Sequence, residues 1–164
     1  MKASPLLLLA LLAAGPPPCR AKDPATTTLN EWPMIMAHDA ATTYFPGGLL
    51  HPIYNWGKTQ ADGGAAGLLA SGARALDWRP NLLGDGTVGM HHGPLNISHK
   101  MADSLDEMVA WAGHHGANDT AELVVLAISD CTGGLPGNCT AAVAELLAEK
   151  KVTAVNCEDL QVID

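Results

Sequence analysis

Two pairs of ionisable side chains carry the chemical interest of this sequence, because each pair stands at the end of a short apolar segment. His38 and Asp39 follow an apolar run of strand length over residues 32–37. Asp77 and Arg79 lie two residues apart, and residues with that spacing on a strand share a face. Imidazoles transfer protons near neutral pH, and a guanidinium presents a planar fork to oxyanions. These residue types suit acid–base chemistry beside a bound anion, although the pattern alone does not define the reaction.

The elements that would position these groups alternate between strand-like and helix-like patterns. An Asp-Gly turn over residues 82–86 joins the strand predicted over 73–79 to another over 87–92, which ends in His91 and His92. Helices are predicted over residues 60–71, over 104–112 with Ser104 as the cap, and over 140–151 with Thr140 as the cap. Strands are also predicted over residues 122–129 and 152–155, and an irregular connection over 47–56. This order indicates an α/β fold with a largely parallel sheet, whose sites form where strands end.

The composition limits the classes of function. The chain has 164 residues, of which 48% are hydrophobic, so we expect one globular domain with its own core. A net charge of −8 argues against nucleic acid as a partner, because phosphate contacts need clustered Lys and Arg. The same charge disfavours electrostatic steering onto anionic membranes, although a transient contact with a membrane surface stays open.

The first residues have the pattern of a secretory leader. Lys2 provides the positive region, an apolar run over residues 6–12 follows, and small residues offer cleavage after Ala14 or Ala21. The apolar run is too short to span a bilayer. We therefore expect a signal peptide over residues 1–21, a domain over 22–164, and an extracellular, secreted protein.

In a secreted protein, cysteines can form disulfides and Asn-X-Ser/Thr sequences can carry N-glycans. Cys131 and Cys139 bracket a turn-rich loop that a local disulfide could close. Cys157 then has no partner in the mature chain unless Cys19 survives processing. Three Asn-X-Ser/Thr sequences are predicted glycosylation sites, at Asn96, Asn118 and Asn138.

Several motifs follow one another in an order that resembles a known family. They are His38-Asp39 with Thr42, residues 55–60, residues 72–79, residues 91–95 and residues 122–128. In this order and spacing they resemble the X-domain of phosphatidylinositol-specific phospholipase C, most nearly the secreted bacterial, metal-independent type. The resemblance implies an irregular TIM-type (β/α) barrel, of which this chain is expected to hold only the N-terminal half.

The resemblance also implies roles in cleavage of a phosphodiester. His38 would be the general base that activates a substrate hydroxyl, and His92 the general acid that protonates the leaving alcohol. Arg79 would bind the phosphoryl oxygens. Asp39 would orient the side of the site that contains His92, and Asp77 would keep the arginine and histidine side chains in position. Both imidazoles suit their roles because unperturbed histidine titrates near neutral pH. His91 is interpreted as structural, since adjacent strand residues face opposite ways.

Two features of the family have no evident counterpart in this chain. The family often places Lys at the end of its fourth strand, where this sequence has Ser129, which we retain as a candidate for substrate binding. Its later strands supply an acidic partner for the residue that corresponds to His38, and the sequence offers no predicted replacement. The chain is therefore expected to be either part of an enzyme or a truncated, non-catalytic secreted module.

Arginine at position 79 favours an enzyme without a metal cofactor, because calcium-dependent relatives use carboxylate and amide ligands there. Asp39 and Asp77 could instead help to hold Ca²⁺ or Mg²⁺. A metal-dependent glycerophosphodiester phosphodiesterase is the alternative enzyme, on a similar barrel. In both interpretations the substrate is a phospholipid or a glycerophosphodiester.

Overall fold

The computed structural model describes residues 33–46, 52–114, 122–135 and 137–155. The chain divides into two units, Met1–Pro33 and Met34–Asp164, and the elements below belong to the second unit. The predicted leader, Cys19, Cys157 and Asn118 lie outside the described residues. No helix in the described ranges is long and apolar enough to cross a membrane.

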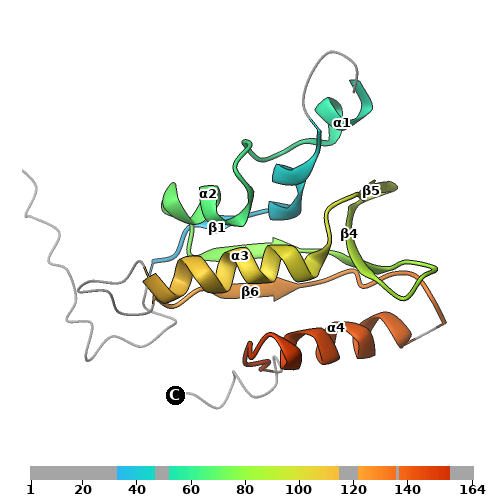
Figure 1. Cartoon of the computed structure of the whole chain (residues 1–164). Coiled ribbons are helices and arrows are strands. Elements are labelled where there is room, and N and C mark those ends of the chain that lie inside the picture. Colours follow the sequence, from blue (N-terminus) through green and yellow to red (C-terminus); the bar gives the residue numbers. More distant parts are fainter. Residues whose placement is uncertain (1–32, 47–51, 115–121, 136, 156–164) are drawn as a thin grey trace, which may run out of the picture. The chain divides into compact units, whose positions relative to one another are not determined.

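A parallel three-stranded sheet forms the centre of the second unit (Figure 1), with its strands in the order β1-β2-β6. These strands are β1 (Met36–Ala37), β2 (Ala75–Trp78) and β6 (Val125–Ile128). All four residues of β2 are buried, as expected for the central strand of a parallel sheet. The described residues form no closed barrel, which agrees with the prediction of a partial barrel.

An antiparallel sheet continues directly from the parallel one. It contains β3 (Pro80–Leu82), β4 (Val88–His92) and β5 (Leu95–Ile97), in the order β3-β4-β5. The prediction of one largely parallel sheet is therefore wrong for this segment, and β3 and β5 were not predicted. The cause is the tight turn at Asp85 and Gly86, where Gly86 has a φ of 83°. A connection this short joins only antiparallel strands, because a parallel pair needs a crossover of a dozen residues or more.

Helices complete the core. They are α1 (Pro52–Gly57), α2 (Gly64–Ala70), α3 (Met101–His114) and α4 (Asn138–Glu149), and a 3₁₀ helix, η2, covers Ala40–Tyr44. One hydrophobic cluster contains residues of β2, α2 and α3, among them Trp78, Leu69 and Leu105, each at most 1% exposed. Burial of these side chains fixes the end of β2 relative to its neighbours.

Several boundaries differ from the sequence predictions. α3 begins three residues before Ser104, which is fully buried inside the helix rather than capping it. Gly137, in the left-handed region, caps α4 in place of Thr140. Part of the segment predicted to be irregular forms α1, which begins with a proline. Residues 152–155 form no strand, and the strand predicted over residues 32–37 is reduced to β1.

A half-buried polar contact joins η2 and the start of α2 to α3. The hydroxyl of Tyr44 donates to Oε2 of Glu107 at 2.5 Å, and the same oxygen accepts the N–H of Ala65 at 2.9 Å. The Tyr44 ring stacks on His99, with ring centroids 3.9 Å apart. These contacts hold η2, and with it the residues just after β1, against the helical layer.

Alkaline pH is expected to destabilise the protein through this contact. Burial and the hydrogen bond to Glu107 raise the pKa of Tyr44 from 10.0 to about 12. Between these values the unfolded chain releases the phenolic proton while the folded chain retains it, so stability falls as pH rises from about 10 to about 12. Tyr44→Phe should flatten this fall in chemical denaturation at several pH values. An equally steep fall in Tyr44→Phe would show that other groups cause it.

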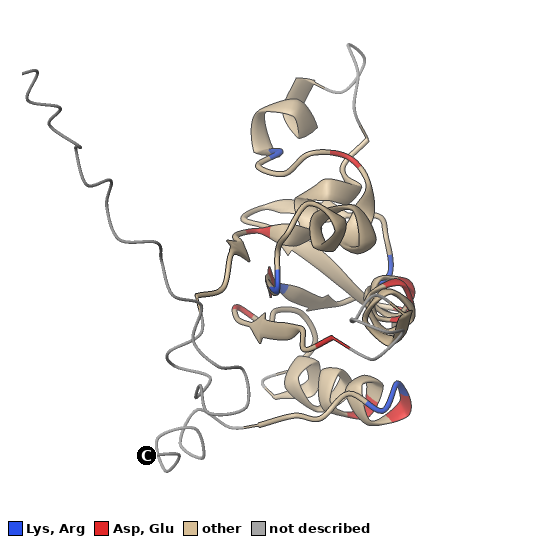
Figure 2. Ribbon diagram, turned by 90° about the vertical axis from the view of Figure 1, so that its left-hand side faces the viewer, with Lys and Arg blue, Asp and Glu red and all other residues tan. Residues whose placement is uncertain are grey.

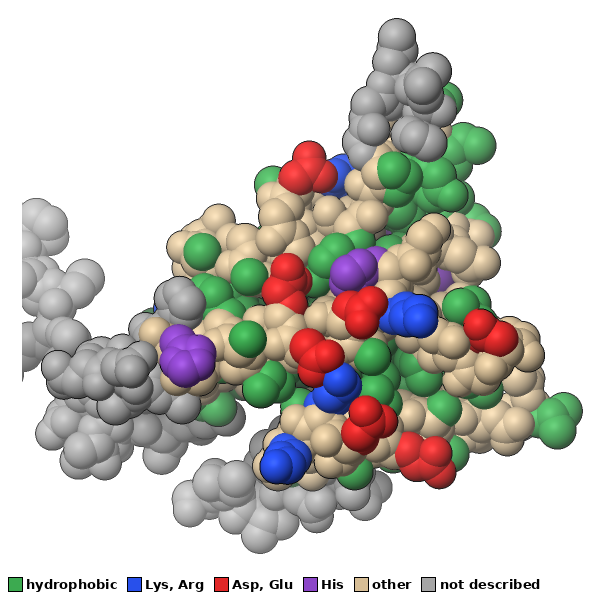
Figure 3. All heavy atoms as spheres, viewed as in Figure 1, with side chains coloured by type: hydrophobic (Ala, Val, Ile, Leu, Met, Phe, Trp, Pro, Cys, Tyr) green, Lys and Arg blue, Asp and Glu red, His purple; other side chains and the backbone are tan. Residues whose placement is uncertain are grey.

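Charged residues are spread along the ribbon of the described elements (Figure 2). On the face that carries α3 and α4, basic side chains stand among acidic ones (Figure 3), and one such pair joins the helices through Lys150 Nζ and Asp106 Oδ2, 2.6 Å apart. This face therefore presents no basic surface for nucleic acid.

Candidate active site

Strand register brings the predicted site residues to one place. Ala37 pairs with Leu76 in the parallel sheet, so the next residues, His38 and Asp77, lie side by side where β1 ends. Trp78 pairs with Ile128 in the same way, which sets Arg79 beside Ser129.

The hairpin of β3 and β4 then brings the chain back to the end of β2, where Arg79 lies. Pro80 pairs with Met90, and the N–H of His91 donates to the carbonyl of Arg79 at 2.9 Å. His92, the last residue of β4, therefore arrives beside Arg79. An antiparallel strand thus delivers the second histidine that the sequence predicted on a parallel strand.

The Asp39 carboxylate lies at the centre of the cluster. Its Oδ2 is 3.3 Å from Nε2 of His38 and 3.1 Å from Nε2 of His92, and its Oδ1 is 2.9 Å from Nη2 of Arg79. Only 6% of Asp39 is exposed, and its backbone is left-handed, with a φ of 50°. Asp tolerates this conformation better than most residues, and such backbones concentrate at functional sites. One buried carboxylate thus joins both imidazoles and the guanidinium.

The Asp77 carboxylate contacts His38 and lies near Arg79. Its Oδ2 lies 2.8 Å from Nδ1 of His38 and accepts the backbone N–H of Asp39 at 3.1 Å. Its Oδ1 accepts a longer hydrogen bond, 3.4 Å, from the hydroxyl of Ser129. A carboxylate of this chain therefore contacts His38, although no replacement for the acid of the family's later strands was predicted. Asp77 on β2 and Arg79 just after it do point together, because Nη2 of Arg79 is 3.9 Å from Oδ2 of Asp77.

The two imidazoles line the open side of this cluster, whereas the carboxylates lie beneath them. The His38 side chain is 69% exposed and that of His92 is 26% exposed. Two carboxylates and one guanidinium lie below the rings. The net charge of the cluster is therefore zero when one of the two imidazoles is in its positively charged imidazolium form. This is the protonation state that an acid–base pair needs, with one ring as donor and the other as acceptor.

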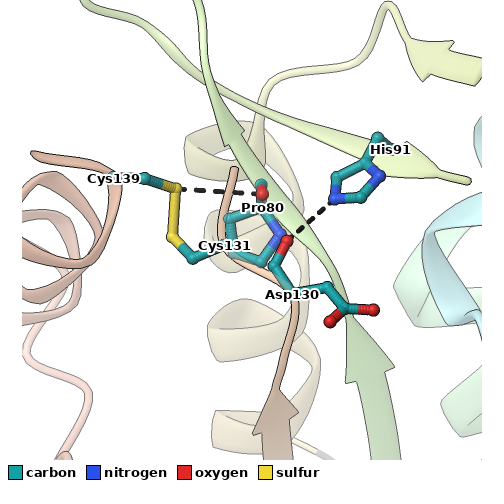
Figure 4. The surroundings of a disulfide bond; sticks show 5 residues. All are labelled: Pro80, His91, Asp130, Cys131 and Cys139. Carbon is teal, nitrogen blue, oxygen red and sulfur yellow. Dashed lines mark hydrogen bonds between the residues drawn. A yellow bond between two sulfur atoms is a disulfide. The ribbon is translucent and has the colours of Figure 1, made fainter. Parts of the chain in front are cut away.

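His91, which the sequence indicated as structural, is held by backbone carbonyls. Its Nδ1 lies 3.0 Å from the carbonyl of Gly93 and its Nε2 lies 2.9 Å from the carbonyl of Asp130 (Figure 4). Both ring nitrogens are therefore engaged away from the pair formed by His38 and His92. The ring links the end of β4 to the segment that follows β6.

Sequence analysis did not select Asp130 and Gln60. Asp130 follows β6 as Asp39 follows β1, has a φ of 47°, and brings Oδ2 to 3.9 Å from Nε of Arg79. The amide of Gln60 donates to the carbonyl of His38 at 2.6 Å and fixes its backbone. The position of Asp130 just beyond a strand was the signal that could have found it, whereas Gln60 ended the motif over residues 55–60 without an assigned role.

The predicted disulfide between Cys131 and Cys139 is present. It ties the segment after β6 to the first turn of α4, and the Cys139 sulfur lies 3.8 Å from the carbonyl of Pro80 (Figure 4). Two predicted glycosylation residues, Asn96 and Asn138, are exposed, and Asn96 accepts a hydrogen bond from the side chain of Asn81. Glycosylation itself stays a prediction.

Removal of this disulfide is expected to lower the free energy of unfolding by about 2.5 kcal/mol, the loop-closure entropy of a loop this short. The double variant Cys131→Ser/Cys139→Ser should show the change in urea denaturation with an unaltered slope. An unchanged midpoint would mean that the packing around the loop, rather than the cross-link, restrains it.

A divalent cation has three ligand atoms available at this site. One atom each from His38, Asp39 and Asp77 lies within 4.8 Å of the others. However, the oxygens of Asp39 already face Arg79 and the two imidazoles, so a cation would compete with the guanidinium for the same carboxylate. Ca²⁺ also prefers six to eight oxygen ligands, more than this set supplies. The donor set therefore fits a metal less well than it fits the arginine.

Comparison with known proteins gives a limited match. No protein-family model matches the chain, and no curated protein matches it in sequence. A mutant form of phosphatidylinositol-specific phospholipase C from Staphylococcus aureus matches with a TM-score of 0.46 and 19% identity, over 78% of this chain and 36% of that chain. A second structure of the S. aureus enzyme, from work on its membrane binding, matches with a TM-score of 0.45 and 20% identity, over 77% and 35%. The chain thus spans little more than a third of these enzymes, and a likeness of this size says nothing of activity.

Proposed function

We propose that this chain carries the catalytic part of a phosphodiesterase that resembles phospholipase C and acts on a phospholipid or a glycerophosphodiester. The observation that carries the proposal is the shared contact of His38, His92 and Arg79 with the Asp39 carboxylate. Two imidazoles beside one guanidinium are the groups that cleavage of a phosphodiester needs: a base, an acid and an anion-binding fork.

The reaction would use a hydroxyl of the substrate next to the phosphoester as the nucleophile. His38 would accept the proton of that hydroxyl, and the oxygen would form a new P–O bond. Asp77 supports this role, because its contact with Nδ1 of His38 orients the ring, and Nε2, now 3.3 Å from Oδ2 of Asp39, would accept the proton when the substrate hydroxyl takes the place of that carboxylate. Arg79 would hold the phosphoryl oxygens while their charge grows.

His92 would complete the reaction from the other side of the phosphate. In its protonated form it would give its proton to the leaving oxygen as the old P–O bond breaks. The products would be a cyclic phosphodiester and a free alcohol, with His38 protonated and His92 neutral. Proton exchange with water would then restore the starting state, and no water is consumed in this step.

A metal-dependent phosphodiesterase is the second candidate, favoured by the proximity of the ligand atoms of His38, Asp39 and Asp77. When bound, a cation there would stabilise the phosphoryl charge in place of the arginine. The ion pair between Arg79 and Asp39 favours the metal-independent route, because a cation would displace it.

Release of a cyclic phosphate tests the proposal. The purified secreted chain is incubated with glycerophosphoinositol and followed by phosphorus NMR, with and without EDTA, beside a His38→Gln control. We expect a cyclic phosphodiester at equal rates with and without EDTA, and none from His38→Gln. Turnover that EDTA abolishes would favour the metal-dependent enzyme. A folded protein that releases nothing would favour a non-catalytic module.

A further inference from the structure

His91 lies where three segments of the candidate site come together. Its backbone N–H donates to the carbonyl of Arg79 at 2.9 Å, just after β2. Its Nδ1 lies 3.0 Å from the carbonyl of Gly93, in the turn after β4, and its Nε2 lies 2.9 Å from the carbonyl of Asp130, after β6 (Figure 4). The next residue along the chain is His92, the proposed general acid. One residue therefore joins the segments that carry Arg79, His92 and Asp130.

The two ring contacts of His91 determine which protons the ring carries. A backbone carbonyl oxygen only accepts hydrogen bonds, so a ring nitrogen that bonds to it must donate. A neutral imidazole has one N–H and one lone pair, and that lone pair would face a carbonyl oxygen at hydrogen-bond distance. Only the imidazolium form has an N–H on both nitrogens. Distances of 3.0 and 2.9 Å are ordinary for N–H···O bonds, so both contacts together fit the doubly protonated ring.

The charged groups on the joined segments are compatible with an imidazolium. Arg79 is cationic, but its guanidinium faces the carboxylates of Asp39 and Asp130. The Asp130 carboxylate belongs to the residue whose carbonyl meets Nε2 of His91. His92, the other histidine of β4, contacts Asp39. Strands β3 and β5, which pair with β4, contain no ionisable side chain.

We propose that His91 is a positioning residue of the phosphodiesterase, held as an imidazolium that joins the end of β4 to the segment after β6. This inference rests on the function proposed above, in which His92 and Arg79 act on the phosphate. The ring acts through the backbone, because both of its contacts are to carbonyls. Without the ring, strand pairing and the backbone bond to Arg79 would have to hold His92 in place.

NMR of the ring nitrogens tests the charge state without turnover. Long-range proton–nitrogen spectra of the purified chain, with the His91 signals assigned from His91→Gln, report whether each ring nitrogen carries a proton. The spectra are recorded at about pH 7.5, where an unperturbed histidine is mostly neutral. We expect protons on both nitrogens of His91. A ring with one unprotonated nitrogen would overturn the proposal.

Two amide substitutions separate the two contacts of the ring. The side-chain nitrogen of Asn can take the position of Nδ1, and that of Gln the position of Nε2. His91→Asn therefore keeps the contact with Gly93, whereas His91→Gln keeps the bridge to Asp130. With glycerophosphoinositol as substrate, we expect His91→Asn to lower kcat by about tenfold with KM nearly unchanged, the scale of one hydrogen bond from a charged group. His91→Gln should lose less than about threefold, because it retains the bridge.

The same pair of substitutions at His114 is the matched control. His114 is exposed at the end of α3, so both exchanges should leave kcat within about twofold of wild type. Equal losses in the two His91 variants, or no loss in either, once circular dichroism shows both to be folded, would overturn the positioning role while the phosphodiesterase stands. A wild-type protein that releases no cyclic phosphate would overturn the proposed function and the positioning role together, whatever the state of the ring.

Discussion

Asp39→Asn is expected to lower kcat/KM for a phosphodiester substrate by about 10⁴-fold, the scale of loss when the carboxylate that orients a catalytic histidine is replaced. The amide keeps the size of the side chain and tolerates the left-handed backbone at this position. It carries no charge to balance Arg79 and presents only one oxygen to the three groups that the carboxylate now joins. The loss should appear mainly in kcat, because these contacts orient reacting groups.

The same exchange on the surface provides the control for Asp39→Asn. Asp103 lies exposed in the first turn of α3, and Asp103→Asn should leave kcat/KM within about twofold of wild type. Circular dichroism and thermal unfolding establish that both variants are folded. A folded Asp39→Asn protein with full activity would show that His92 and Arg79 need no carboxylate between them, contrary to our account of the site.

Arg79→Lys is expected to reduce kcat by about 10²-fold or more, because one oxyanion contact contributes on that scale. The guanidinium faces Asp39 through Nη2 and Asp130 through Nε, with a planar fork that can also face a phosphate. A lysine ammonium keeps the charge but is a single point, so it cannot make these contacts together. Steady-state kinetics on the same substrate measure the effect.

Arg74 is a matched control for the arginine exchange. Its Nε lies 2.5 Å from Oε2 of Glu122, and its guanidinium stacks over the ring of Trp111 at 4.8 Å from the centroid. Arg74→Lys should therefore change stability slightly and leave kcat within about twofold. Equal losses in the two variants would mean that Arg79 supports the fold rather than the reaction.

The sequence was sufficient to predict that His38, Asp39, Asp77, Arg79 and His92 meet at one place, although it did not indicate Asp130 or Gln60. Apolar segments that stop at His38 and before Arg79 marked strand ends, and parallel strands place such ends together. The disulfide followed from two cysteines that bracket a turn-rich loop. These signals are local, or depend on a rule of topology, so a single sequence contains them.

Other features depended on contacts that no local pattern records. The Asp-Gly turn was evident, yet its consequence, an antiparallel hairpin that returns His92 to Arg79, was overlooked in favour of a parallel sheet. The pairing of Asp77 with His38 depends on the register between β1 and β2, which the sequence leaves open. Ser104 and Thr140 resembled caps, but α3 begins three residues before Ser104, which is fully buried, and α4 begins two residues before Thr140.

The central claim is that His38, His92 and Arg79 surround one phosphate group. Binding of inositol 1-phosphate to the purified chain, followed by NMR of the histidine rings in the presence of EDTA, tests it without turnover. We predict that the rings of His38 and His92 shift together along one saturation curve, that the ring of His91 shifts far less, and that Arg79→Lys weakens the binding. Independent shifts of the two rings, or no shift until a divalent cation is added, would contradict the account.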